Sequence, residues 1–413
     1  MKRAAAVLAL WLRGVSIAHG GVADAPGEQL EVSLITYGPG AIYWERFGHN
    51  AIEIHDKLSD QAASFNYGVF DFDERGFLLN FARGYMHYLI DVAPSEADQK
   101  LYREEGRSVL RQRLQLGAGE AARLRDFLVQ NLLPQNAHYD YDYLADNCST
   151  RVRDAIDRVT GGALRAQLTQ RPASMSYRAQ IDRLMSAQPW MMLPMDFGLG
   201  PFADQPLDAW RESFLPAILA RELSTVRIDD GHGASRLLVD AESEVAPNRL
   251  PPPPAAAPDL RPPLALAGAC LAALIFLSLR RARTLAAVLA TVFLGVGGIA
   301  GLFLLGLWTL TMHRAAWANT NLLLLNPLCF ALLPAVWRAR RGLATSMAVR
   351  TLLALQGVGI LIGIVVHLLP APTQQNQPWL LFSVPPWAAV AWMLLRRPRQ
   401  NLSLPASVAP LRR

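Results

Sequence analysis

The chain has three cysteines, and only one of them, Cys148, precedes the long apolar stretches that begin near residue 264. Cys148 lies in the string DNCSTR (146–151), and the apolar spacing of residues 149–159 predicts a helix that begins here, with Asp146 or Asn147 as its cap. A thiol in the first turn of a helix lies at the positive end of the helix dipole, which stabilises the thiolate. An isolated cysteine is more often a buried, inert residue. The helix start and the polar neighbours favour a nucleophile here.

A thiol nucleophile needs a base within hydrogen-bond reach, normally an imidazole. The candidates that precede the apolar half are His49, His55, His87, His138 and His232. His49 is the best placed, because the string FGHN (47–50) opens a predicted strand directly after the Gly-rich turn 38–40. His55 would share a strand face with His49, but no further residues with metal-ligand spacing complete a site. We therefore expect thiol chemistry with no metal and no cofactor.

Alternation of apolar and polar residues predicts the sheet that carries these groups. Strands are expected at 30–36, 50–55, 64–70, 85–92 and 109–116. Helical spacing follows at 119–132 and at about 149–159, with Cys148 directly at the start of the second helix. Strands followed by helices indicate an α+β domain.

The charge of the 413-residue chain is divided unevenly. The whole chain carries +6, but residues 261–413 contain 14 Arg and no Lys, Asp or Glu, which leaves 40 − 14 = 26 basic against 34 acidic residues before them. The first part therefore carries −8 and the second +14. The positive charges lie between long apolar runs, which excludes a basic nucleic-acid-binding surface. The pattern indicates a membrane protein with an acidic soluble domain in front.

Five apolar stretches make up the second part of the chain. They lie at 264–279, 285–310, 322–337, 352–369 and 379–395. A helix needs about 17 to 25 apolar residues to cross a bilayer, and each stretch with its flanks comes near that length. Arginines cluster after the first, third and fifth stretches, so the positive-inside rule places these gaps and the tail 397–413 in the cytoplasm. The membrane domain is then 264–396, and the residues before it lie on the non-cytoplasmic side of the membrane.

The N-terminal sequence agrees with export. Lys2 and Arg3 precede the short apolar run 4–12, and small residues follow, so residues 1–25 read as a signal peptide or an uncleaved anchor. The Pro-rich segment 247–263 predicts a semi-rigid spacer. Residues 26–246 form the exported domain, which would be periplasmic or extracellular.

Several strings match a known family. They are YGPG (37–40), WERFGHN (44–50), NYG (66–68), DYDYLADNCSTR (140–151) and WRESFLP (210–216), together with His313, Asn319, Asn321, Asn326 and Pro327. Over nearly its whole length the sequence resembles the Lnb-type lipoprotein N-acyltransferases. The resemblance implies a papain-like fold in permuted order, similar to lecithin:retinol acyltransferase, in which the histidine precedes the cysteine. The pair Asn147-Cys148 matches the Asn-Cys pair of those relatives. Their third catalytic group is a histidine that this chain does not offer at that place, and Asn66 is our substitute.

The resemblance and the residues both predict acyl transfer. Cys148, activated by His49, would attack an ester of a membrane phospholipid, and the thioester would acylate the N-terminal diacylglyceryl-cysteine of a lipoprotein. The enzyme would lie in a bacterial inner membrane with its catalytic domain in the periplasm. Two rival hypotheses remain: a membrane-tethered cysteine peptidase or amidase acting on cell-wall peptides, and a non-catalytic module in which Cys148 is a core thiol.

Further polar residues are expected to bind the lipid substrates. They are Tyr37, Trp44, Arg46, Asn147, Arg151, His313, Arg314, Asn319 and Asn321. Arg314, in an outward loop, would meet a lipid phosphate. Alternatives are an internal ion pair within 44–46, and helix capping with interfacial anchoring by Trp317 in the outward loop.

Overall fold

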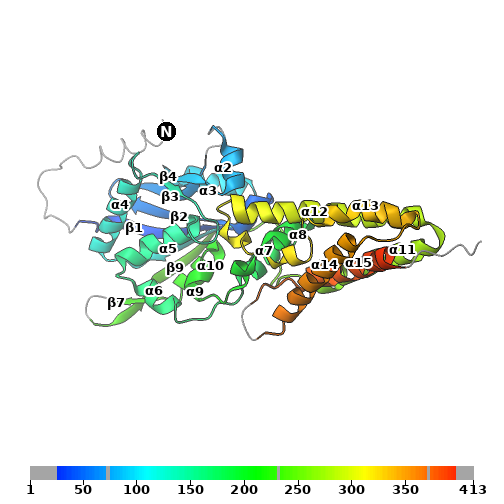
Figure 1. Ribbon diagram of the computed structural model, residues 1–413. Coiled ribbons are helices and arrows are strands. Elements are labelled where there is room, and N and C mark those ends of the chain that lie inside the picture. The colour runs from blue at the N-terminus through cyan, green and yellow to red at the C-terminus, as the bar shows by residue number, and fades with distance from the viewer. Residues whose placement is uncertain (1–25, 71–74, 230–232, 370–372, 397–413) are drawn as a thin grey trace, which may run out of the picture. The chain divides into compact units, whose positions relative to one another are not determined.

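The computed structural model describes residues 26–70, 75–229, 233–369 and 373–396, so the expected signal segment 1–25 and tail 397–413 lie outside the described residues. The chain forms two compact units (Figure 1). The first comprises Met1–Pro258 with Leu310–Trp317, and the second Asp259–Thr309 with Ala318–Arg413. The first is a mixed α/β domain and the second is helical.

A seven-stranded antiparallel sheet forms the centre of the first unit, in the order β6-β4-β3-β2-β1-β5-β9. Its strands are β1 (Leu30–Tyr37), β2 (His49–Asp56), β3 (Gln61–Val69), β4 (His87–Pro94), β5 (Val109–Leu114), β6 (His138–Asp140) and β9 (Val239–Ala246). The five predicted strands are confirmed as β1 to β5. The edge strands β6 and β9 were not predicted, because one is three residues long and the other is mostly exposed and polar.

Helices cover both faces of this sheet (Figure 1). On one face α4 (Ala118–Asn131) and α5 (Cys148–Val159) bury the main core, which includes Leu34, Ile52, Phe65, Leu124 and Ile156. On the other face α3 (Ser95–Glu104) lies over polar residues and a small cluster around Tyr37. Burial of both faces explains why β1 is buried along nearly its whole length. The second face also positions the residues behind His49.

Short helices complete the first unit. They are α2 (Phe77–Arg83), α6 (Ala163–Leu168), α7 (Tyr177–Met185), α8 (Pro189–Gly198), α9 (Ala209–Glu212) and α10 (Pro216–Leu223), with a separate hairpin of β7 (Arg227–Asp229) and β8 (Ser235–Leu237). Arg178 of α7 forms buried ion pairs with Asp196 of α8 at 2.7 Å and with Asp204 at 2.8 Å. Its position ties α7 to α8 and to the turn that follows.

Asp182, one turn after Arg178 on α7, makes stability depend on pH. Burial, and then the charge of Asp196, raise the pKa of Asp182 to about 8. The folded state therefore holds a proton that the unfolded chain releases near pH 4, so stability falls by up to about 1.4 kcal/mol per pH unit between pH 4 and 8. Asp182→Asn, which mimics the protonated acid, is expected to flatten this part of the profile of melting temperature against pH. Parallel profiles for the two proteins would contradict the assignment.

The second unit contains four helices that are long and apolar enough to cross a membrane, counted over the described residues. They are α11 (Arg261–Arg281), α12 (Arg283–Leu310), α14 (Met347–Val366) and α15 (Gln377–Leu395). The predicted spanning stretch at 322–337 differs, because the structure has only the 12-residue α13 (Cys329–Arg340) there. Asn326-Pro327 delays the helix start, and 12 residues rise only about 18 Å against a bilayer core of about 30 Å.

Candidate thiol active site

Cys148 is the first residue of α5, as expected, and its side chain is buried. Asn147 caps the helix: its Oδ1 accepts a hydrogen bond from the backbone N–H of Thr150 at 2.9 Å. Thr150 returns the interaction, because its hydroxyl accepts from the backbone N–H of Asn147 at 2.7 Å. This reciprocal cap fixes the point at which the helix begins and so places the thiol at the positive end of α5.

His49 opens β2, where it lies opposite Tyr37 in the β1–β2 ladder. Its Nε2 lies 2.9 Å from Oδ1 of Asn66 on β3. The imidazole and the thiol of Cys148 also lie close enough for each to shift the pKa of the other. Because Asn66 occupies Nε2, Nδ1 is the ring nitrogen left for the thiol. The three residues predicted to be catalytic therefore lie together in one array, with the imidazole in contact with the Asn66 amide and beside the thiol.

The array favours the ion pair of thiolate and imidazolium. Burial alone would raise the pKa of Cys148, but the charge and hydrogen bond of His49, with backbone N–H groups of Asn50 and Ser149, lower it below its ordinary value. Burial opposes the charged form of His49 too, yet the thiolate, Asn66 and the carboxylate of Asp98 raise the imidazole pKa. The thiol is thus more nucleophilic near neutral pH than an ordinary cysteine.

Asp98 on α3 stands behind this array and was not predicted from the sequence. Its Oδ2 accepts from the Asn66 amide at 3.3 Å and from the hydroxyl of Tyr37 at 2.7 Å. The ring of Tyr37 stacks on Tyr102, with centroids 3.6 Å apart. Asp98 thereby holds the Asn66 amide with its oxygen toward His49. Tyr37, expected to bind substrate, supports this carboxylate from a fully buried position.

Removing Asp98 should weaken the thiolate. In Asp98→Ala the Asn66 amide loses an acceptor and the imidazolium loses a nearby negative charge, so the pKa of His49 should fall and that of Cys148 should rise. Loss of one charge-assisted hydrogen bond corresponds to roughly a tenfold slower alkylation of Cys148 by iodoacetamide at pH 6. Glu96→Ala, an exposed acid on the same helix, is the matched control. Equal rates for both variants would exclude this role for Asp98.

Gly68 makes room beside the nucleophile. Its φ is +88°, and the β3–β4 register shifts between Tyr67 and Val69. A Cβ at this position would lie 3.2 Å from the ring of Tyr141 and 3.6 Å from Cβ of Cys148. Only glycine adopts this left-handed backbone without strain, so the conformation brings the strand close to the thiol.

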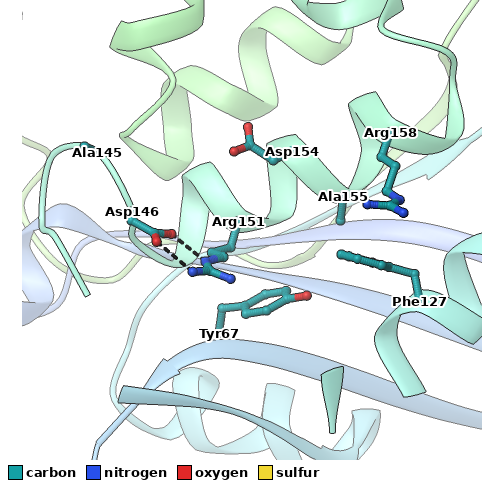
Figure 2. Close-up of a pocket in the computed structure, with 8 residues that line it drawn as sticks. All are labelled: Tyr67, Phe127, Ala145, Asp146, Arg151, Asp154, Ala155 and Arg158. Carbon is teal, nitrogen blue, oxygen red and sulfur yellow. Dashed lines mark hydrogen bonds and ion pairs between the residues drawn. The ribbon is translucent and has the colours of Figure 1, made fainter. Parts of the chain in front are cut away.

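A pocket of about 430 Å³ lies beside α5 (Figure 2). It is lined by Tyr67, Phe127, Ala145, Asp146, Arg151, Asp154, Ala155 and Arg158. Figure 2 shows the guanidinium of Arg151 between Asp146, with which it forms two hydrogen bonds, and the ring of Tyr67. The positive charges of Arg151 and Arg158 equal in number the negative charges of Asp146 and Asp154 in the pocket lining. Arg151, an expected substrate-binding residue, therefore lies in a polar pocket with no net charge.

Three other expected substrate-binding residues differ in exposure. Arg46 is buried and donates to the backbone carbonyls of Leu184 at 3.0 Å and Gly40 at 3.1 Å, so it fixes the Gly-rich loop and not an ion pair within 44–46. Trp44 is half exposed. Asn147 donates its amide to two backbone carbonyls, at 3.0 and 2.9 Å, in addition to its capping bond. Arg46 and Asn147 thus shape the site from within the protein.

The segment 310–317 brings His313 and Arg314 into the first unit. His313 Nε2 lies 3.1 Å from the carbonyl oxygen of Phe81, and its ring centroid lies 6.0 Å from that of Tyr143. The backbone carbonyl of Tyr143 accepts one of the Asn147 amide bonds. The segment therefore contacts the loop that leads into the nucleophile helix. Arg314 begins a single 3₁₀ turn, Arg314–Ala316.

Asn319 and Asn321 lie in the second unit, both buried. Asn319 Oδ1 accepts from Gln374 at 3.0 Å and from the backbone of Asn321 at 2.9 Å, while Asn321 Oδ1 accepts from Asn376 at 2.8 Å. Asn319 also caps the turn Thr320–Leu323. These bonds match the helix-capping alternative, and a substrate role for the pair stays a prediction.

Comparison with known protein families gives two matches. Residues 23–183 match the Lnb N-terminal periplasmic domain, and residues 260–383 match the Lnb transmembrane domain. No curated protein and no solved structure gave a significant match. The array of Cys148, His49 and Asn66 lies entirely within the first matched region.

Proposed function

The chain belongs to the Lnb-type family of membrane proteins with a periplasmic domain, and on that premise we propose that it is a thiol-dependent lipoprotein N-acyltransferase. The observation that carries the proposal is the array of Cys148, His49 and Asn66 at the capped start of α5. The order of these groups along the chain, with histidine first and cysteine last, supports a permuted papain-like fold. Thiol, imidazole and amide have the roles that a cysteine acyltransferase needs.

In the first half-reaction the Cys148 thiolate attacks the ester carbonyl of a membrane glycerolipid, for which a phospholipid is the donor we expect. The backbone N–H of Cys148, at the start of α5, would stabilise the oxyanion. His49, which holds the proton of the thiol, gives it to the departing alkoxide. The S–C bond forms as the C–O bond breaks, which leaves an acyl thioester on Cys148 and a lysolipid.

In the second half-reaction the α-amine of the lipoprotein's N-terminal diacylglyceryl-cysteine attacks the thioester. His49 accepts the proton that the amine loses, and the departing thiolate is stabilised by the same ion pair as before. An amide forms and the free enzyme returns. A thioester suits this step because it reacts with amines more readily than the oxygen ester from which it came.

The membrane helices favour lipid substrates over soluble peptides. A tethered peptidase would need one anchor, whereas the described residues include four candidate spans. Both proposed substrates are anchored in the bilayer, so an enzyme built on several membrane helices can meet them at the membrane surface. We place the protein in the inner membrane of a bacterium, with its C-terminus in the cytoplasm, because of the arginine distribution.

A reconstituted assay tests this proposal. The full-length protein in phospholipid vesicles is given a synthetic diacylglyceryl-cysteine lipopeptide, and the products are weighed by mass spectrometry. Gain of one acyl chain on nitrogen, with release of lysophospholipid, is the expected result. If the lipopeptide becomes acylated on nitrogen without a change in mass, the protein is still an N-acyltransferase, but the acyl donor is an ester of the lipopeptide and not a phospholipid. Cleavage of cell-wall peptides without any N-acylation would favour the amidase.

A further inference from the structure

The helix α2 (Phe77–Arg83) presents apolar side chains to the outside of the first unit. None of its residues is buried, and Leu78 is 79% exposed, with Leu79, Phe81 and Tyr85 also exposed. Leu78 and Phe81 are three positions apart, which places them on the same side of the helix. Phe77 instead packs inward, with its ring 5.8 Å from that of Phe70. The outer side of α2 is therefore an apolar surface in a soluble domain, a feature that marks interaction sites.

Positive charges border this surface. Arg75 precedes α2 and Arg83 ends it, and both are exposed. Asp71, Asp73 and Glu74 come directly before Arg75, but no Asp or Glu follows until Asp91, so the helix itself and its C-terminal side carry only positive charge. Apolar side chains flanked by arginines are typical of segments that lie in the interface of an anionic membrane.

The end of α2 is bonded to the segment that follows α12 in the chain. The backbone N–H of Met312 donates to the carbonyl of Arg83 at 2.8 Å, and His313 contacts the carbonyl of Phe81. Met312 belongs to the same unit as α2 and follows the last residue of α12, Leu310, by two positions. Two residues span at most about 7 Å. The end of α2 is thus bonded to the segment that directly continues a 28-residue apolar helix.

We propose that α2 is an interfacial membrane-binding helix of the exported domain. Leu78, Leu79 and Phe81 insert into the outer leaflet, and Arg75 and Arg83 pair with lipid phosphates. The partner is a phospholipid surface, and not a second protein, because the bond from Met312 to Arg83 joins α2 to the segment that directly continues an apolar candidate span. Through His313 and Tyr143 the same segment contacts the loop before Cys148. The helix therefore holds the thiol domain against the surface in which its substrates lie.

Spin labelling of the full-length protein in phosphatidylethanolamine–phosphatidylglycerol nanodiscs tests this directly. A nitroxide is attached at Leu78→Cys, in a background with the three native cysteines replaced. Its collision rates are measured with oxygen, which concentrates in the bilayer, and with a water-soluble nickel chelate. Leu58→Cys is the control, because Leu58 is 81% exposed in the turn between β2 and β3, beside Asp56 and Lys57. We expect an oxygen-to-nickel ratio at least about threefold higher at position 78 than at position 58. Equal ratios would overturn the proposal, and so would shielding of position 78 from both reagents, which would indicate a protein partner.

A second pair of variants keeps Cys148 and measures the consequence. Leu78→Glu should slow acyl transfer from vesicle lipids by about tenfold, whereas Leu58→Glu should not. Alkylation of Cys148 should be unchanged in both variants, which shows that the domain is folded and its array intact. Loss of alkylation would assign Leu78 to the fold and overturn the lipid role. Because the spin-label ratios require no turnover, they test the membrane contact even if the proposed acyl transfer is wrong.

Discussion

Cys148→Ala is expected to abolish N-acylation of a lipopeptide, with a rate at least about 10⁴-fold below that of the native protein. The substitution removes the atom that carries the acyl chain, and Cys148 is the only cysteine among the described residues of the first unit. Cys148→Ser should fail as well, because a hydroxyl placed beside His49 lacks the low pKa that makes the thiol reactive. The rate is measured by mass spectrometry of the lipopeptide in the reconstituted assay.

Cys270→Ala provides the matched control, since Cys270 is exposed on α11 in the second unit. Its transfer rate should equal that of the native protein. The melting temperature of Cys148→Ala should stay within a few degrees of the native value, so that lost activity cannot be attributed to unfolding. Substantial N-acylation by Cys148→Ala would establish that Cys148 is only a core thiol.

His49→Ala is expected to produce the second largest loss, about 10³-fold in transfer, because imidazole moves the proton in both half-reactions. It should also reverse the pKa shift of the nucleophile. Burial, which raises the pKa of Cys148, would no longer be opposed by the charge of His49. Iodoacetamide should then alkylate Cys148 only at alkaline pH, whereas the native thiol should already react near neutral pH.

His55→Ala serves as the comparison on the same strand. His55 lies on the same strand face as His49, but its ring is hydrogen-bonded to Asp60 at 3.0 Å, outside the array. Transfer and the alkylation profile should both be native in this variant. If His49→Ala kept the native profile, a different group would have to hold the proton of Cys148.

Local sequence signals explain which parts of the site could be predicted. Asn147 and Thr150 form a cap within four residues, so the helix start and the position of Cys148 are visible in the sequence itself. His49 was found because the Gly-rich turn and the alternation after it place it at the start of a strand. Asn66 was chosen through the family resemblance, as the substitute for the third catalytic histidine of the relatives, and it lies on β3, which pairs with β2.

Contacts between distant segments explain the rest. Asp98 is one of several acids on an amphipathic helix, and only the packing of α3 on the sheet brings it to Asn66. Arg46 bonds to the carbonyl of Leu184, far along the chain, and not to an acid within 44–46, which had been the alternative to a substrate role. The return of Met312 to α2 likewise carries no sequence signal, because it rests on backbone bonds that any residues could make.

An acyl group on Cys148 is the most direct test of the proposed chemistry. The full-length protein is incubated with phospholipid and no acceptor, digested under acid conditions, and the peptide that contains Cys148 is weighed. We predict that this peptide gains the mass of one fatty acyl chain, that neutral hydroxylamine removes it, and that added lipopeptide accepts it. If the lipopeptide is N-acylated while Cys148 never carries an acyl group, the proposed mechanism is wrong.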